Sequence, residues 1–496
     1  MARFRFLIIC ALLSVAAAPR PAPTNPLADK LKPKHPNIIF ILADDLGYGD
    51  LGCYGQAKIK TPNIDRLAAE GMRFTQCYAG STVCAPSRSA LMTGQHTGHT
   101  RVRGNEPVPL RPEDVTVAEV LQKAGYKTGA FGKWGLGLAN TTGVPTKQGF
   151  DEWFGYLSQT HAHDYYPTQL FRNDEIMFFD ENSAGRKGAW SHNLFTKTAT
   201  NFVRSYKYFS FFLYLPYTVP HANNELTKVT GNGMEIPSDA PYSKEDWPQQ
   251  EKNKAAMITR LDRDIGAILD QLEKLSIDDN TIIFFTSDNG PHKEGGVKPE
   301  FFNSSGGLRG IKRDLYEGGI RVPMIVRWPG KIPAGKVSDQ VWAFWDFLPT
   351  AAEIAGQPLP TNTVAAASNT GGASVPASRG QMDGISMLPT LLGQKQTNQH
   401  EFLYWEFHEK GTKQAVRMGD WKAVRLAPKE RLELYDLKTD RTETKNVAAD
   451  NPQIVSKIEN YLLTARSESE RWPIRTPAEQ AEAAKKRGAA KDEDVN

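Results

Sequence analysis

The sequence contains few cysteines and no large excess of charge of either sign. Only four of its 496 residues are cysteine, and Cys10 lies in a segment that we expect to be removed. The other three, Cys53, Cys77 and Cys84, are too few for a disulfide framework, although Cys53 and Cys77 could either pair or remain free thiols. The 60 basic and 56 acidic residues nearly balance, and no basic run is interleaved with aromatic residues. These features exclude a disulfide-stapled scaffold and do not indicate a nucleic-acid partner.

Apolar runs long enough to span a membrane are also missing. The apolar stretch 6–18 follows Arg3 and Arg5 and ends in small residues, which is typical of a secretory signal peptide. It is shorter than the roughly 20 apolar residues of a spanning helix, so we prefer a cleaved signal to a retained anchor. We predict a signal peptide at 1–18, a Pro-rich leader at 19–35, export to the periplasm or the extracellular space, and no stable membrane insertion.

What the sequence does contain is a series of short apolar runs separated by helical patterns. A run that is apolar at every position suits a parallel strand buried on both faces. The stretch from Met257 to Leu272 instead has apolar residues at helical spacing, which predicts an amphipathic helix. The runs that we interpret as strands are residues 37–42, 126–131, 209–215, 281–286 and 322–328. This alternation predicts an α/β domain over residues 36–357, with a large, mostly parallel, doubly wound sheet flanked by helices.

The composition changes after residue 357. Residues 358–380 are rich in Ala, Ser, Thr, Asn and Gly without periodicity, which is typical of a flexible surface insert. Short strand-like runs with turn signals between them then precede a helical pattern at 453–462. We predict a smaller C-terminal α+β domain at 381–470 that contains an antiparallel sheet. The charged tail, residues 471–496, has little to bury and is expected to be a frayed helix or disordered.

Polar residues gather where the apolar runs end. Asp44 and Asp45 follow the first run, and Asp288 and Asn289 follow the run at 281–286. Ligands of a doubly wound sheet bind beyond the carboxyl ends of its strands. Adjacent carboxylates repel each other unless a cation lies between them, and a hard divalent cation accepts such oxygen donors. The pattern predicts a metal site at this edge of the sheet, whereas a solvated turn would explain the first pair alone.

The stretch Cys84-Ala85-Pro86-Ser87-Arg88 predicts the start of a helix that ends at Gly94. Proline suits the first turn of a helix, and glycine suits the position after its end. The positive end of the helix would stabilise a negative charge at Cys84, either a thiolate or a bound oxyanion. Arg88 adds a guanidinium that matches sulfate or phosphate geometry. The alternative is a small helix with a half-buried cysteine and a surface arginine.

This stretch resembles the C-x-P-S-R signature of the type I sulfatases, and the resemblance extends from about Pro36 to about Leu462. The family has the alkaline phosphatase superfold, and the chain is most similar in character to bacterial secreted carbohydrate sulfatases. The resemblance implies that a formylglycine-generating or sulfatase-maturating enzyme converts Cys84 to formylglycine. It further implies hydrolysis of a sulfate monoester, an O-sulfate on a carbohydrate, to inorganic sulfate and an alcohol.

The resemblance also implies roles for individual residues. The hydrated aldehyde would attack sulfur, and Arg88 would steady it. Lys133 and Lys312 would bind the sulfate group, and His221 would protonate the departing alcohol. One calcium ion, in preference to magnesium, would be bound by four residues and completed by residue 84; the four are Asp44, Asp45, Asp288 and Asn289.

One position departs from the family pattern. Many members have histidine two residues after the first lysine, where this chain has Gly135. We therefore consider His161 and His163 as replacements, because residues at i and i+2 face the same side of an extended segment. His163, beside the carboxylate of Asp164, is the better candidate for the base that deprotonates the aldehyde hydrate. The alternatives are a surface loop pair or a second metal site.

Three other functions remain open from the sequence. A phosphatase or phosphonate monoester hydrolase of the same superfold would use a similar anion site, although two metal ions are usual for phosphate esters and we find ligands for one. A non-catalytic protein that binds sulfated glycans would explain Gly135. A thiol enzyme would require Cys84 to remain unmodified.

Overall fold

The computed structural model describes residues 33–359 and 382–493, without the side chains of 487–493. The predicted signal peptide, nearly all of the leader and nearly all of the predicted insert lie outside the described residues. Within the described ranges, no helix is long and apolar enough to cross a membrane. Cys53 and Cys77 are both free thiols, so the alternative in which they pair is wrong.

The described residues form a central sheet in the order β10-β2-β9-β8-β1-β7-β3-β4-β5-β6, with β11 paired to β2. The strands are β1 Asn37–Ala43, β2 Met72–Tyr78, β3 Lys127–Lys133, β4 Glu152–Tyr156, β5 Gln169–Arg172, β6 Glu175–Phe178, β7 Phe211–Pro216, β8 Thr281–Ser287, β9 Arg321–Arg327, β10 Lys336–Ser338 and β11 Trp342–Ala343. The central strands β8, β1, β7, β3 and β4 are parallel. The predicted parallel sheet is thus confirmed at its centre, while β9 is antiparallel to both of its neighbours.

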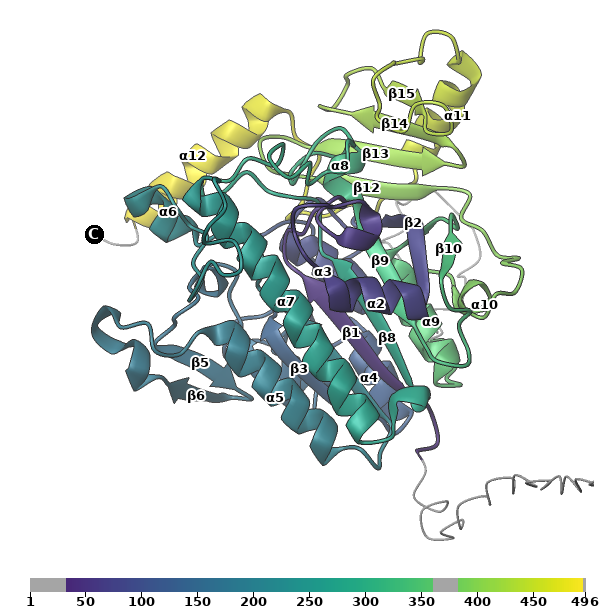
Figure 1. The fold of residues 1–496 in the computed structure, drawn as a ribbon. Helices are drawn as coiled ribbons and strands as arrows, with labels where there is room; N and C mark the ends of the chain where they lie inside the picture. Colours follow the sequence, from purple (N-terminus) through teal and green to yellow (C-terminus); the bar gives the residue numbers. More distant parts are fainter. Residues whose placement is uncertain (1–32, 360–381, 494–496) are drawn as a thin grey trace, which may run out of the picture.

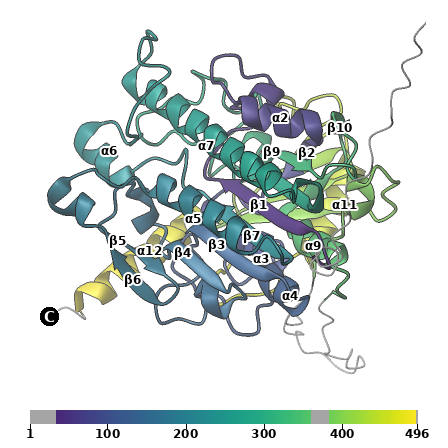
Figure 2. The same ribbon diagram turned by 60° about the horizontal axis from the view of Figure 1, so that its bottom comes forward.

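Helices cover both faces of this sheet, which explains why β1 is apolar at every position after Asn37. Ile39 and Ile41 pack against the helices of one face, and Ile38 and Phe40 against those of the other. The first face carries α2 Pro62–Glu70, α5 Ser191–Ser205 and α7 Gln249–Lys274, which lie side by side (Figures 1 and 2). The second carries α3 Cys84–Thr93, α4 Val117–Lys123 and α9 Phe347–Ile354. Shorter helices are α6 Asn224–Thr230, α8 Glu317–Ile320 and α10 Leu388–Leu391.

The C-terminal part forms a separate antiparallel sheet, as predicted. Its order is β12-β13-β14-β15, with β12 Leu403–Phe407, β13 Lys413–Met418, β14 Trp421–Arg425 and β15 Glu433–Asp436. One face packs on α11, Pro452–Leu462, and the other packs on the main domain through Trp405 and Tyr435. The tail forms α12, Pro477–Glu493, which extends away from the small sheet in Figure 1.

The ends of two helices show how local contacts position the chain. Thr116 and Glu119 form a capping box at the start of α4. Thr61, which precedes α2, does not cap that helix and instead accepts a hydrogen bond from the Gly52 backbone N–H at 2.9 Å. Gly71 follows α2 without a left-handed conformation, and it is needed for a different reason. A β-carbon there would lie 2.4 Å from the Val326 carbonyl oxygen, so a larger residue would push β9 away.

Candidate active site

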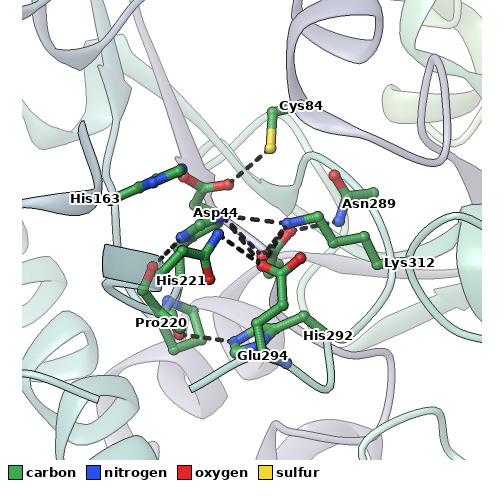
Figure 3. Close-up of polar contacts among 12 residues, drawn as sticks. Asp44, Cys84, His163, Pro220, His221, Asn289, His292, Glu294 and Lys312 are labelled. Atoms are coloured by element: carbon green, nitrogen blue, oxygen red, sulfur yellow. Dashed lines mark hydrogen bonds and ion pairs between the residues drawn. The ribbon is translucent and has the colours of Figure 1, made fainter. Parts of the chain in front are cut away.

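The predicted metal ligands and catalytic residues meet at the carboxyl ends of the central parallel strands, and all of them are buried, whereas His161 and His163 are partly exposed (Figure 3). Asp44 and Asp45 follow β1, Lys133 ends β3, and Asp288 follows β8. His221 lies in the loop after β7. Because these strands are adjacent and parallel, their ends lie at one edge of the sheet, and residues up to 267 positions apart come into contact there.

Cys84 begins α3 at this edge, and Gly94 ends the helix in a left-handed conformation, with φ of 67°. The Cys84 Sγ lies 3.4 Å from Asp44 Oδ1. Burial, together with the charge of Asp44, raises the pKa of the Cys84 thiol well above its usual value. The thiolate that the helix start alone would favour is therefore opposed by its surroundings. The alternative of a half-buried cysteine with a surface arginine is wrong, because Cys84 and Arg88 are both fully buried.

Arg88 connects three elements of the site. Its Nε and Nη2 donate to Asp288 Oδ2 at 3.1 and 2.8 Å, and its Nη1 donates to the Lys133 carbonyl oxygen at 2.8 Å. The guanidinium fork thus holds the ends of β3 and β8 against α3. A lysine could not replace it, since a single ammonium group cannot reach both partners in this planar arrangement.

The two lysines contact the paired aspartates. Lys133 Nζ donates to Asp44 Oδ2 at 2.7 Å, and Lys312 Nζ donates to Asp45 Oδ2 at 2.8 Å. Burial opposes ionisation of both acids, but Lys133 holds the pKa of Asp44, and Lys312 that of Asp45, well below the usual range. Both carboxylates are therefore charged inside the protein.

His221 has a defined tautomer. Its Nδ1 lies 2.6 Å from the Ala222 carbonyl oxygen, which can only accept, so Nδ1 carries a proton. Its Nε2 lies 3.1 Å from Lys312 Nζ and 3.4 Å from Asp45 Oδ2. Burial and the charge of Lys312 lower the pKa of His221 to about 3. His221 is thus neutral here, with the lone pair of Nε2 directed into the site.

Two residues of the loop after β8 belong to the site although the sequence analysis missed them. Glu294 Oε2 accepts from Lys312 Nζ at 3.1 Å. His292 Nδ1 accepts from the Glu294 N–H, and its Nε2 donates to the Pro220 carbonyl oxygen at 3.1 Å, which places the loop that carries His221. Both follow Asp288 and Asn289 within six residues, and this proximity was the one signal that could have found them.

The space beside Gly135 is filled by a residue that was not predicted. Gly135 has φ of 79°, and a β-carbon there would lie 1.8 Å from Gln159 Nε2. Both side-chain polar atoms of Gln159 are buried without a hydrogen-bond partner. The hypothesis that His163 enters the space left by Gly135 is therefore wrong, because Gln159 occupies it.

His161 and His163 lie on a 3₁₀ helix rather than an extended segment. His163 stacks on His221 with ring centroids 4.8 Å apart, and its Nδ1 lies 3.0 Å from Glu225 Oε2. His161 instead packs edge-on against Tyr156. The predicted pairing of His163 with Asp164 is wrong, because Asp164 Oδ1 accepts from the Tyr166 backbone N–H.

The residues present fit a hard divalent cation. The ligand atoms of Asp44, Asp45, Cys84 and His221 lie within 4.8 Å of one another. Asn289 Oδ1 is buried with no hydrogen-bond partner, although its Nδ2 donates to Asp45 at 2.7 Å. Burial and the charge of Asp44 raise the pKa of Asp288 to about 7. A cation would use the orphaned oxygen and relieve the repulsion among the three acids.

The doubly wound sheet, with its buried cluster of acids and bases at the carboxyl edge, has the alkaline phosphatase superfold. The chain belongs to the sulfatase family, whose model matches residues 36–357, and it is a type I sulfatase, an enzyme of the sulfuric ester hydrolase class.

Relatives and solved structures support this assignment. The chain is 28% identical to the N-acetylgalactosamine-6-O-sulfatase of Bacteroides thetaiotaomicron, over 87% of this chain and 93% of that protein. It is 30% identical to the N-acetylgalactosamine-6-sulfatase of Canis lupus familiaris, over 85% of this chain and 75% of that protein. The crystal structure of Ps i-CgsB in complex with k-i-k-neocarrahexaose matches with a TM-score of 0.74 and 28% identity, covering 89% of this chain and 96% of that one.

Proposed function

We propose that this protein hydrolyses O-sulfate monoesters of carbohydrates outside the cytoplasm, with one bound Ca²⁺ and a formylglycine made from Cys84 by a maturation enzyme. The observation that supports it most directly is that Cys84 and Lys133 both contact the carboxylate of Asp44. The side chain of residue 84 contacts Asp44, and Lys133 reaches the other oxygen of the same carboxylate. Asp44 would thus hold both residue 84, which is to carry the nucleophile, and Lys133, which is to bind the tetrahedral sulfate group.

The proposed metal ligands are the oxygens of Asp44, Asp45, Asp288 and Asn289, with residue 84 next to them. A calcium ion bound there would neutralise the acids and attract the sulfate group. An aldehyde at position 84 would supply, as its hydrate, an oxygen nucleophile whose sulfate ester can be released again.

Lys133 and Arg88 would prepare the site for an anion. Lys133 has three N–H donors and uses one on Asp44, so two remain for sulfate oxygens. Donors that are already in position when charge develops lower the barrier without reorganising. Arg88 keeps Asp288 in place through its two hydrogen bonds and so orients the metal ligand.

His221 would deliver a proton to the leaving oxygen from Nε2, because Nδ1–H is committed to the Ala222 carbonyl. The charge of Lys312 and burial hold this ring neutral in the structure. An anionic sulfate placed beside Nε2 would raise the pKa of His221, since a negative neighbour favours the imidazolium form. Binding of the substrate would therefore charge the acid that it needs.

The carbohydrate substrate is supported by what the similar proteins act on or bind. The bacterial and canine relatives are N-acetylgalactosamine 6-sulfatases, and Ps i-CgsB was solved with k-i-k-neocarrahexaose. The predicted signal peptide agrees with a polymeric substrate met outside the cytoplasm.

Mass spectrometry of the peptide that holds residue 84 tests this proposal, on protein produced with and without a maturation enzyme. We expect the aldehyde only in the matured protein, and release of sulfate from para-nitrophenyl sulfate and from N-acetylgalactosamine 6-sulfate only by that form. An unmodified thiol in fully active protein would contradict the mechanism. Faster release of phosphate from para-nitrophenyl phosphate would favour the phosphatase alternative.

A further inference from the structure

His163 and Glu225 form a pair at the edge of the catalytic site that the proposed reaction does not use. His163 Nδ1 lies 3.0 Å from Glu225 Oε2. The histidine belongs to the 3₁₀ helix after β4, and Glu225 lies in the first turn of α6, four residues after His221. The pair therefore joins the segment after β4 to the segment that carries the proposed general acid.

The ring of His163 lies next to the reacting groups. It is nearly parallel to the ring of His221, with an angle of 11° between the planes and the centroids 4.8 Å apart. The charges of Lys133 and Asp44 act on the pKa of His163 in opposite directions, so both charges are close to this ring. Figure 3 shows the His163 side chain reaching toward Asp44 and His221. A sugar whose leaving oxygen meets His221 therefore has His163 beside it.

A buried tyrosine holds the two segments together. Tyr165, two residues after His163, has a hydroxyl that lies 2.7 Å from the carbonyl oxygens of both Thr218 and His221, to which it donates. The position of His163 relative to His221 is thus set by contacts within the protein. A group that is in place before the substrate arrives costs little ordering when the substrate binds.

Glu225 fixes which nitrogen of His163 is free. A carboxylate only accepts, so Nδ1 carries the proton and Nε2 of the neutral ring is an acceptor. Burial and the charge of Lys133 lower the pKa of His163, which favours the neutral ring. The two ring nitrogens point in nearly opposite directions, and Glu225 is at the surface, with 53% of its side chain exposed against 16% for His163. Nε2 is therefore directed away from the surface, and in the described part of the chain it has no hydrogen-bond partner.

A free acceptor at this place fits a group that donates a hydrogen bond. A sugar hydroxyl provides such a donor. A sulfate group has no proton to donate, and it would face both the lone pair of Nε2 and the negative charge of Glu225 behind the ring.

We infer that His163, oriented by Glu225, is a specificity-determining residue whose Nε2 accepts a hydrogen bond from a free hydroxyl of the sugar that carries the scissile sulfate. The inference rests on the proposed function and deepens it. It makes the preferred substrate a sugar unit in which a hydroxyl beside the scissile sulfate is unsubstituted.

The test measures kcat/KM of the matured protein. The fastest substrate is first chosen from N-acetylgalactosamine 6-sulfate, N-acetylglucosamine 6-sulfate and galactose 4-sulfate. It is then compared with its monodeoxy analogues, each of which lacks one hydroxyl. We expect one analogue to lose about tenfold in kcat/KM, the effect of one hydrogen bond between neutral groups.

Variants of the pair show whether His163 makes this contact. His163→Phe keeps a ring against His221 without the acceptor. It should lose about tenfold on the full sugar and show no further loss on the sensitive analogue. The matched control is His161→Phe on the same 3₁₀ helix, where the ring packs against Tyr156, and it should keep the parent's preference. Glu225→Gln, whose amide oxygen can still accept from Nδ1, should keep more of the preference than Glu225→Ala.

Three outcomes would overturn the inference. One is an equal preference for the hydroxyl in the parent and in His163→Phe, which would leave His163 only the role of placing His221. Another is a parent that hydrolyses all monodeoxy analogues as fast as the full sugar. The third is faster hydrolysis of a sugar with a second sulfate in place of that hydroxyl, since His163 would then bind as a cation.

The two proposals can be told apart when one fails. Sulfate release by the parent with an unchanged preference in His163→Phe would remove only the hydroxyl contact. Release of sulfate from none of the sugars by the matured parent would remove the proposed function, and the inference with it.

Discussion

The protein buries two clusters of charge, and they differ in how the charges are balanced. The interdomain cluster joins the small sheet to the main domain. Its Lys422 Nζ lies 2.9 Å from Glu317 and 3.0 Å from Glu443, and Arg321 donates to Glu317 at 3.0 Å. The catalytic cluster is equally buried and contains the three aspartates, the two lysines and Arg88 of the site.

Each cluster contains one acid that burial and a neighbouring carboxylate make hard to ionise. The pKa of Glu443 is raised to about 7 by burial and Glu317, and that of Asp288 to about 7 by burial and Asp44. Each affected acid has a cation beside it, Lys422 for Glu443 and Arg88 for Asp288. Each cluster also holds a buried acceptor without a hydrogen bond, Glu443 Oε1 in the first and Asn289 Oδ1 in the second. The catalytic cluster differs in that four potential metal ligands lie within 4.8 Å of one another, those of Asp44, Asp45, Cys84 and His221. Buried charge by itself therefore does not mark a functional site.

The largest expected effect concerns residue 84. Cys84→Ala should abolish multiple turnover, because its methyl group cannot be converted to the aldehyde. Cys84→Ser should do the same as long as its hydroxyl group is not oxidised, because an unmodified serine would stay sulfated after one attack. The melting temperature of the folded protein should change little, since a small residue at a helix start contributes little packing. Activity assays and thermal melts of the same preparations check both parts. Sustained turnover by the alanine variant, or by a serine variant that mass spectrometry shows to be unmodified, would contradict the formylglycine mechanism.

The second largest effect is expected when His221, the proposed general acid, is removed. His221→Ala should slow sugar sulfates by about 10²–10⁴-fold and aryl sulfates much less, because a phenolate leaves without a proton. Comparison of kcat on both substrates checks this. Equal losses on the two would remove the general-acid role.

Removal of one lysine from each cluster should distinguish them directly. Lys422→Met leaves Glu317 and Glu443 without their shared cation and should cost about 3–5 kcal/mol of unfolding free energy, with or without calcium. Lys133→Met leaves Asp44 without this cation and repelled by Asp45 and Asp288. Bound calcium should restore much of the unfolding free energy that this variant loses. Denaturant unfolding with calcium and with chelator measures the difference. Equal calcium dependence in the two variants would contradict the assignment of the metal to the catalytic cluster.

Calcium should also stabilise the parent by mass action. At a concentration 100 times the dissociation constant, a ligand that binds only the folded state adds about 2.7 kcal/mol. Asp288→Ala should lose this increment together with activity, whereas Glu443→Ala should keep the calcium-dependent increment. Thermal melts across a calcium titration provide the measurement. Full activity of the parent after exhaustive chelation would exclude the metal role.

The smallest expected effect is a pH dependence of the interdomain cluster. A carboxyl whose pKa rises from 4.5 to about 7 on folding favours folding below pH 4.5 and loses that contribution as the pH rises through 7. Glu443→Gln does not titrate. Relative to the parent, the variant should therefore gain about 2.5 kcal/mol of unfolding free energy between pH 5 and pH 8.5. Unfolding curves at both pH values check it, and a parallel pH dependence of the two proteins would refute the raised pKa.

Much of the fold followed from local pattern. Largely apolar runs became the central strands because the sheet is covered on both faces, and the capping box of Thr116 formed because its two partners are three residues apart. The direction of β9 did not follow, since an apolar run is equally compatible with either orientation in a covered sheet. Only its neighbours β2 and β8 decide that orientation.

The candidate site also has features that the sequence predicts and features that only the tertiary structure shows. By itself the sequence determined that Cys84 starts a helix, that acids follow buried strands, and that Gly135 has no side chain, because these properties depend on neighbours within a few positions. Only the tertiary structure decided that Gln159 fills the space beside Gly135 and that Glu225 rather than Asp164 binds His163. These partners lie 24 or more residues apart, and the packing of whole segments, which has no local signal, brings them together.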